Sequence, residues 1–103
     1  MYGTIARLRV RAGAEEQLAS WSRSAGTRPI NGWLASYVYR ADADPRELWL
    51  VVVFESREAY LVNAESDKQD AEYRRLRALL EADPEWHDGE VLFALEASAA
   101  TGR

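Results

Sequence analysis

The stretch ELWLVVVFE, residues 47–55, decides the fold of this chain. Seven consecutive apolar residues run from Leu48 to Phe54, and most are β-branched or aromatic, the types that favour strands. A strand with one face in water would alternate between apolar and polar residues, and this one does not. Both faces of the strand must therefore be covered by other apolar surface.

Three more segments have the pattern of strands. Residues Tyr2–Arg11 alternate between apolar and polar side chains, and Trp33–Arg40 is rich in aromatic and β-branched residues. After a turn at Trp86–Gly89, residues Glu90–Ala97 (EVLFALEA) form the last apolar segment. We predict a strand for each of the three.

Helical patterns fill two of the intervals between these strands. The first is Ala14–Ala25, with two acids in its first turn, where the free N–H groups favour negative charge. The second runs from Arg57 to about Asp83; Ser56 is its expected N-cap, and a second cap signal predicts a break near Ser66. The order strand–helix–strand–strand–helix–strand predicts an α+β, ferredoxin-like split βαβ fold, an antiparallel sheet with the helices on one face. We expect one domain over residues 1–97 and a disordered tail over 98–103.

Helices can cover only one face of such a sheet. Trp49, Val51 and Val53 make the other face of the 47–55 strand apolar as well. An exposed patch of that kind on a monomer favours association. We therefore predict a homodimer that packs sheet face against sheet face.

Composition excludes several classes of function. The 103 residues include no cysteine and a single histidine, His87, so we expect no disulfide, no metal site and no catalytic triad. The net charge of −4 argues against a nucleic-acid partner. No apolar run is long enough to span a membrane and no signal peptide is recognisable, so we expect a cytoplasmic protein with no membrane partner.

Four short stretches resemble one family. They are an Arg-x-Gly strand end followed by acids (residues 11–16), Gly32-Trp33, a Tyr-x-x-Arg-x-Asp stretch (residues 37–42) and FESREAY (residues 54–60). Together they resemble the antibiotic biosynthesis monooxygenase domain of the dimeric α/β-barrel superfamily, over about residues 3–95.

The resemblance implies oxidation of a phenolic or polycyclic aromatic metabolite to a quinone, with no cofactor. Its pocket is expected between the sheet and the helices. Tyr60 and Arg74 match a tyrosine and an arginine of quinone-forming relatives, so they are the expected catalytic residues: Tyr60 to donate or exchange a proton, Arg74 to stabilise negative charge. The residues expected to bind the substrate are Leu50, Phe54, Tyr37, Tyr73 and Arg77.

The sequence also departs from the family. Leu50 and Phe54 stand where relatives have an asparagine and a tryptophan, and Arg74 falls off the apolar stripe that Leu76 and Leu80 form. A rival hypothesis is therefore a dimeric α/β-barrel protein that binds a small apolar ligand without catalysis. The haem-degrading branch needs an asparagine on the first strand and a histidine in residues 57–83, and this sequence has neither.

Two groups of side chains allow two interpretations each. Trp33, Tyr37 and Tyr39 share one face of an ideally alternating strand, and they are either a ligand platform or part of the dimer interface. His87 and Asp88 are either an acid–base pair or exposed residues of a turn.

Overall fold

The computed structural model describes residues 1–25 and 29–97 of the chain. These residues form four strands and three helices in the order β1, α1, β2, β3, α2, α3, β4. The bounds are β1 Tyr2–Arg9, α1 Glu15–Ala25, β2 Trp33–Arg40, β3 Glu47–Phe54, α2 Arg57–Ala64, α3 Asp67–Arg77 and β4 Glu85–Glu90. The predicted tail, residues 98–103, lies outside the described residues, and the single domain over residues 1–97 stays a prediction.

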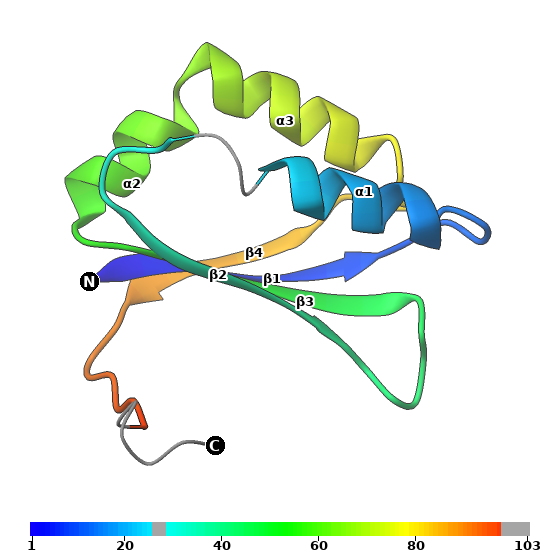
Figure 1. Ribbon diagram of the computed structural model, residues 1–103, viewed down its shortest axis with the longest axis horizontal. Helices are drawn as coiled ribbons and strands as arrows, with labels where there is room; N and C mark the ends of the chain where they lie inside the picture. The colour runs from blue at the N-terminus through cyan, green and yellow to red at the C-terminus, as the bar shows by residue number, and fades with distance from the viewer. Residues whose placement is uncertain (26–28, 98–103) are drawn as a thin grey trace.

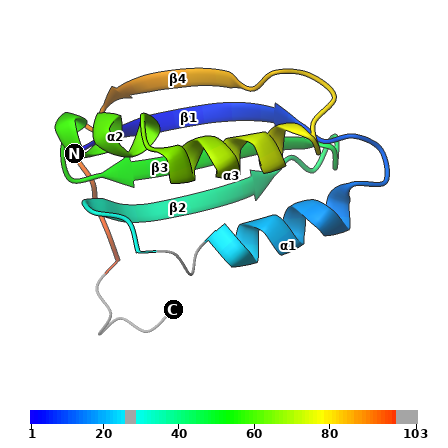
Figure 2. The same ribbon diagram turned by 90° about the horizontal axis from the view of Figure 1, so that it is seen from above.

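The four strands form one antiparallel sheet in the order β2-β3-β1-β4. All three helices lie on the same face of this sheet (Figure 1), and α2 and α3 run above β1 and β3 when the molecule is seen from above (Figure 2). The predicted α+β, ferredoxin-like fold is confirmed. The strand of residues 47–55 is a central one, with one face toward the helices and the other on the side of the sheet that has no helix.

The core lies between the helices and the two central strands. Ala6 pairs with Leu50 and Leu8 with Leu48 across β1 and β3, and all four side chains are buried. Helices α1 and α3 close the core from above with Leu18 and Leu76 respectively, while Val10 and Leu80 complete it. The alternate side chains of β1 and β3 that face the helices therefore form the sheet side of the core.

The predicted break in the second helical region is confirmed. The Ser56 hydroxyl accepts a hydrogen bond from the Ala59 N–H at the start of α2, and the Ser66 hydroxyl accepts one from Gln69 at the start of α3. The predicted end near Asp83 is wrong, because α3 ends at Arg77. After Arg77, the Leu79 carbonyl accepts a hydrogen bond from the Arg11 N–H, and the Glu81 N–H donates to the Arg9 carbonyl. These bonds hold residues 79–81 beside the end of β1 and out of the helix.

The predicted last strand is also wrong. The chain pairs with β1 through Glu85–Glu90, so Trp86–Gly89 is part of a strand and not a turn. Residues 91–97 form no strand, and Leu92, Phe93 and Leu95 are at least 80% exposed. The apolar residues 90–97 have a higher strand propensity than the polar sequence EWHDGE, residues 85–90. EWHDGE nevertheless forms the strand, because its backbone pairs with β1.

A bulge in β2 changes which side chains share a face. Trp33 pairs with Phe54 but Ala35 pairs with Val53, so Leu34 is an extra residue between them. The alternation restarts after Leu34. Trp33 therefore faces the helices, and its predicted common face with Tyr37 and Tyr39 is wrong.

Candidate functional site

A cavity of about 730 Å³ lies between the sheet and the helices, and we call it the sheet–helix cavity. Its floor consists of helix-facing residues from all four strands, since alternate side chains of a strand point to the same face. The floor residues are Thr4 of β1, Trp33, Ser36 and Val38 of β2, Leu50, Val52 and Phe54 of β3, and Trp86 and Asp88 of β4.

The walls of the cavity come from the three helices. The residues that α1 and α2 contribute are Trp21, Ser22, Tyr60, Asn63 and Ala64, and those from α3 are Gln69, Asp70, Glu72, Tyr73 and Leu76; Ile30, before β2, completes the lining. The Trp21 indole N–H donates to the Glu72 carbonyl oxygen over 3.3 Å, so α1 and α3 are joined across the top. A cavity of this size with mostly apolar walls is suited to a small organic ligand.

Helix α2 is held against the sheet by the loop before β2. Gly32 has φ +79°, a conformation that L side chains rarely adopt, and its carbonyl accepts from the Glu55 N–H over 2.7 Å. A Cβ at Gly32 would lie 2.6 Å from the Cβ of Ala59. This close approach fixes the first turn of α2, and Tyr60 follows directly.

The Tyr60 hydroxyl is the best-defined polar group in the cavity. It donates to Asp88 Oδ1 over 2.9 Å, and its ring makes edge contacts with Tyr2 and Phe54, at centroid distances of 5.3 and 5.7 Å. Burial, followed by the hydrogen bond to Asp88, raises the pKa of Tyr60 to about 12, while the nearby Thr4 hydroxyl acts in the opposite direction. Tyr60 is therefore protonated at neutral pH, and in this structure it donates its proton to Asp88.

Thr4 and Asp88 are directly opposite each other on β1 and β4. Thr4 is only 5% exposed; its hydroxyl forms no well-made hydrogen bond within the described residues, and its weak contact with the Tyr60 oxygen works against the rise in the pKa of that tyrosine. Asp88 is exposed along the β4 edge of the sheet. The two side chains and the Tyr60 hydroxyl thus share one corner of the cavity.

The charged groups that line the cavity are acids. Asp70, Glu72 and Asp88 contribute carboxylates, and the described lining residues include no Arg, Lys or His. Glu72 Oε1 accepts from Arg75, and its buried Oε2 has no partner in the described part of the chain. The charged side chains of the described lining are therefore all acidic, and two of them, Asp70 and Glu72, pair with arginines that do not line the cavity.

The structure brings four of the seven predicted site residues together. Leu50, Phe54, Tyr60 and Tyr73 all line the sheet–helix cavity. The other three, Arg74, Arg77 and Tyr37, lie elsewhere.

Arg74 and Arg77 lie on the outer side of α3, beside an open depression that Tyr73 also borders. The Arg74 side chain is 77% exposed and pairs with Asp70 over 2.6 Å. Arg77 bonds to Asp83 and to the Leu80 carbonyl. The guanidinium groups of Arg74 and Arg77 therefore do not face the cavity. For Arg74 this agrees with its position off the apolar stripe of the helix that contains Leu76.

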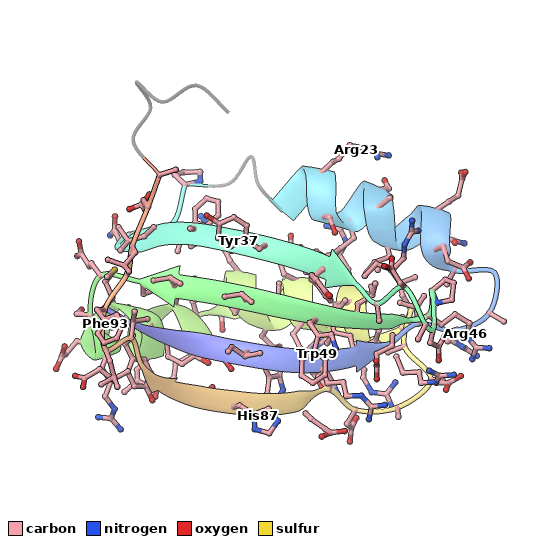
Figure 3. All side chains as sticks on the ribbon, turned by 90° about the horizontal axis from the view of Figure 1, so that it is seen from below. Arg23, Tyr37, Arg46, Trp49, His87 and Phe93 are labelled. Atoms are coloured by element: carbon pink, nitrogen blue, oxygen red, sulfur yellow. The ribbon has the colours of Figure 1, made fainter. Side chains whose placement is uncertain are left out.

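Tyr37 lies on the face of the sheet away from the helices, which we call the far face. Ile5, Tyr37, Val51 and His87 form a cross-strand row on this face, and Figure 3 shows Tyr37, Trp49 and His87 from this side. Tyr37 is 65% exposed. Because His87 and Asp88 are consecutive in β4, they point to opposite faces, so of the two interpretations the acid–base pair is excluded and the residues lie in a strand instead of a turn.

Sequence analysis missed Thr4, Asp88 and Glu72 as site residues. Thr4 could have been found, because it is the one polar residue on the apolar side of the first strand. Asp88 was hidden by the mistaken turn at Trp86–Gly89.

The described residues contain no cluster of His, Cys, Asp and Glu suited to a metal ion. Among the helices described, none is long and apolar enough to cross a membrane.

The pKa of Tyr60 predicts a pH effect on stability. Above pH 10.0 the unfolded chain ionises at this tyrosine while the folded chain keeps its proton up to about pH 12. Stability must therefore fall as pH rises through that window. Denaturant unfolding across the window should show this loss in the wild type and a smaller loss in Tyr60→Phe. The matched control is Tyr39→Phe, outside the cavity; if Tyr60→Phe and this control behave alike, the assignment is wrong.

Comparison with known proteins identifies a related family. The model of the family described as antibiotic biosynthesis monooxygenase matches residues 1–74. No protein with a curated description matches the sequence.

Solved structures of proteins that bear this family's name have the same fold. A protein from Bordetella bronchiseptica is 18% identical, with 89% of this chain and 97% of that chain covered and a TM-score of 0.77. One from Deinococcus radiodurans is 16% identical, with 95% and 99% covered and a TM-score of 0.77. One from Chloroflexus aurantiacus is 23% identical, with 92% and 96% covered and a TM-score of 0.75. At these identities the similarity shows the fold alone.

Proposed function

The chain belongs to the antibiotic biosynthesis monooxygenase family, and on that premise we propose that it oxidises a phenolic or polycyclic aromatic metabolite to a quinone without a cofactor. The observation that carries this proposal is the Tyr60 hydroxyl, protonated and placed in an aromatic-lined cavity. The reaction needs apolar walls for a flat ring, a donor near the substrate oxygen, and exclusion of water.

The walls support binding of a ring. Leu50 and Phe54 on the floor and Tyr73 on α3 offer apolar and aromatic surface, and the volume of about 730 Å³ is in the range of small-molecule sites. The other two proposed binding residues, Tyr37 and Arg77, do not line this cavity. Any ligand that Tyr37 binds would therefore lie on the far face, and any ligand that Arg77 binds would lie on the outer side of α3.

The proposed reaction consumes one phenol and one dioxygen and gives one quinone and one water. One oxygen atom of dioxygen becomes the new carbonyl oxygen, and the other leaves as water with two hydrogens from the substrate. The electrons come from the substrate, whose phenolate form is electron-rich. To donate to the substrate oxygen or exchange a proton with it, the Tyr60 hydroxyl would have to turn its proton from Asp88 Oδ1 toward the substrate.

Arg74 remains a proposed stabiliser of negative charge. Its partner Asp70 lines the cavity, so the guanidinium is one ion pair away from the ligand space. The exposed side chain would have to leave Asp70 and turn inward to reach a bound oxyanion. We therefore expect a smaller contribution from Arg74 than from Tyr60.

Oxygen uptake with anthrone-type and hydroquinone-type substrates tests the proposal. Tyr60→Phe should lower kcat by about 100-fold or more, because it removes the proton donor and leaves the ring in place. Arg74→Ala should lower kcat by a smaller factor. The matched control is Tyr39→Phe, which removes a hydroxyl from the far face and should leave kcat unchanged. Equal rates in wild type, Tyr60→Phe and Arg74→Ala would reject the assigned roles.

A second candidate function is binding of a small apolar ligand without catalysis. It is favoured by the absence of a cation among the described residues that line the cavity, since an oxyanion there has no positive partner. A protein of this kind would bind an aromatic probe and consume no oxygen with it.

We also propose that two copies associate through their far faces. The row Tyr37–Val51–Ile5 and the neighbouring pair Tyr39–Trp49 make this face apolar over three strands. Ile5, Tyr37 and Tyr39 are each about half exposed or more. A second copy of the same face would cover them and would complete a two-fold dimer.

A further inference from the structure

The corner of the cavity formed by Thr4, Tyr60 and Asp88 has a hydrogen-bonding capacity that the protein itself does not use. The three side chains come from β1, α2 and β4, and they meet because Thr4 and Asp88 are cross-strand partners and Tyr60 bonds to Asp88. All three line the cavity.

This corner is rich in acceptors. The Tyr60 hydroxyl uses its single proton on Asp88 Oδ1, so its oxygen is left to accept. Asp88 Oδ2 accepts from no donor within the described residues. The buried Thr4 hydroxyl, which forms no well-made hydrogen bond there either, can donate or accept. A ligand group that completes these bonds must bring at least one proton to donate.

The charges act in the same direction. Asp70 and Glu72 line the cavity from α3, and their partners Arg74 and Arg75 do not line it. An anionic ligand would meet three carboxylates and no lining cation in the described part of the site, whereas a neutral hydroxyl meets acceptors.

We propose that Thr4, Tyr60 and Asp88 form a subsite that binds the hydroxyl group of a neutral aromatic ligand, with Asp88 as the acceptor of the hydrogen bond that this hydroxyl donates. The acidic lining excludes carboxylated aromatics built on the same ring. This rests on the proposed function in that it names the ligand class of the same cavity. It is a statement about binding, so it can be tested without turnover.

Three probes that share the naphthalene ring and differ in one substituent separate the effects: 2-naphthol as a neutral donor, 2-methoxynaphthalene as a ring without a donor, and 2-naphthoate as an anion. Binding is measured by quenching of tryptophan fluorescence, since Trp21, Trp33 and Trp86 line the cavity. We expect 2-naphthol to bind about tenfold more tightly than either of the other two probes. Equal affinity for 2-naphthol and 2-naphthoate, or no binding of 2-naphthol, would overturn the proposal.

Asp88→Asn tests the residue itself. It keeps the shape and removes the charge, so 2-naphthol should bind about threefold to tenfold more weakly and 2-naphthoate more tightly than in wild type. A merely structural role would weaken both probes together, and that result would reject Asp88 as the acceptor. Asp42→Asn, an exposed carboxylate in the β2–β3 connection, makes the same change of net charge and should leave both affinities as in wild type.

Thr4→Val gives an independent result should Asp88→Asn fold poorly. Removing a buried hydroxyl that forms no well-made hydrogen bond should keep or raise Tm, while affinity for 2-naphthol falls about threefold or more. Unchanged affinity in Thr4→Val would remove Thr4 from the subsite. If 2-naphthol binds as expected but no oxygen is consumed with any substrate, the subsite stands and the proposed oxidation fails.

Discussion

Gly3→Ala is expected to destabilise the protein by about 3 kcal/mol, at the upper end for an inserted methyl group. A Cβ at Gly3 would lie 1.8 Å from the Val52 carbonyl oxygen and 2.9 Å from its carbonyl carbon. Both are backbone atoms of β3, so no side chain can rotate to relieve the contact. The two central strands would have to separate there, close to the Tyr2–Phe54 end of their pairing, where Gly3 is the partner of Val53.

The matched control is Gly89→Ala. Gly89 is the cross-strand partner of Gly3 on β4, and a Cβ there would meet nothing within 4 Å. Its free energy of unfolding should stay within about 0.5 kcal/mol of wild type. Urea unfolding of the two variants measures the difference directly. Similar losses in both would show that the approach of β1 to β3 does not determine the effect.

Val51→Asp is expected to convert the proposed dimer to a monomer. Val51 lies in the middle of the far face, paired with Ile5 on one side and Tyr37 on the other. A carboxylate there would be enclosed against its own copy without a partner, which costs several kcal/mol at an interface. Sedimentation at micromolar concentration should give twice the 11.7 kDa chain mass for wild type and the single chain mass for the variant.

Val62→Asp is the control for this experiment. It is the same substitution at a residue of α2 that is 71% exposed and lies on the helical side of the sheet. It should leave the sedimentation of the wild type unchanged. A wild-type protein that sediments as a single chain would refute the association through the far face.

The central part of the fold was predictable because several signals agree there. The strand at residues 47–55 is apolar on both faces, and Ser56 and Ser66 each cap a helix as their position in the sequence predicts. The last strand was not predictable, since EWHDGE has few strand-forming residues and becomes a strand by pairing with β1. The bulge at Leu34 was equally hidden, because strand patterns assume an unbroken period of two.

The candidate site follows the same division. Leu50, Phe54 and Tyr60 lie in well-predicted elements, and the structure places all three in the cavity. Arg74 was matched by position in a family, and its direction depends on helical phase, which places it beside Asp70 on the outer side. Asp88 needed the correct register of β4 and could not be found without it.

The far end of the sheet from Tyr60 has a different composition. Arg7, Arg9 and Arg46 form ion pairs there with the carboxylates of Asp44, Glu47, Glu81 and Glu85. These pairs tie β1 to the β2–β3 connection, to the segment after α3 and to β4. None of their members lines the sheet–helix cavity.

Dissolved salt therefore weakens the ion pairs at this end of the molecule, and also the Asp70–Arg74 pair beside the cavity. Screening weakens exposed ion pairs, whereas a neutral hydroxyl bound near Thr4 has no net charge to screen. The ionic strength of the surroundings can change without altering which neutral molecules the cavity accepts.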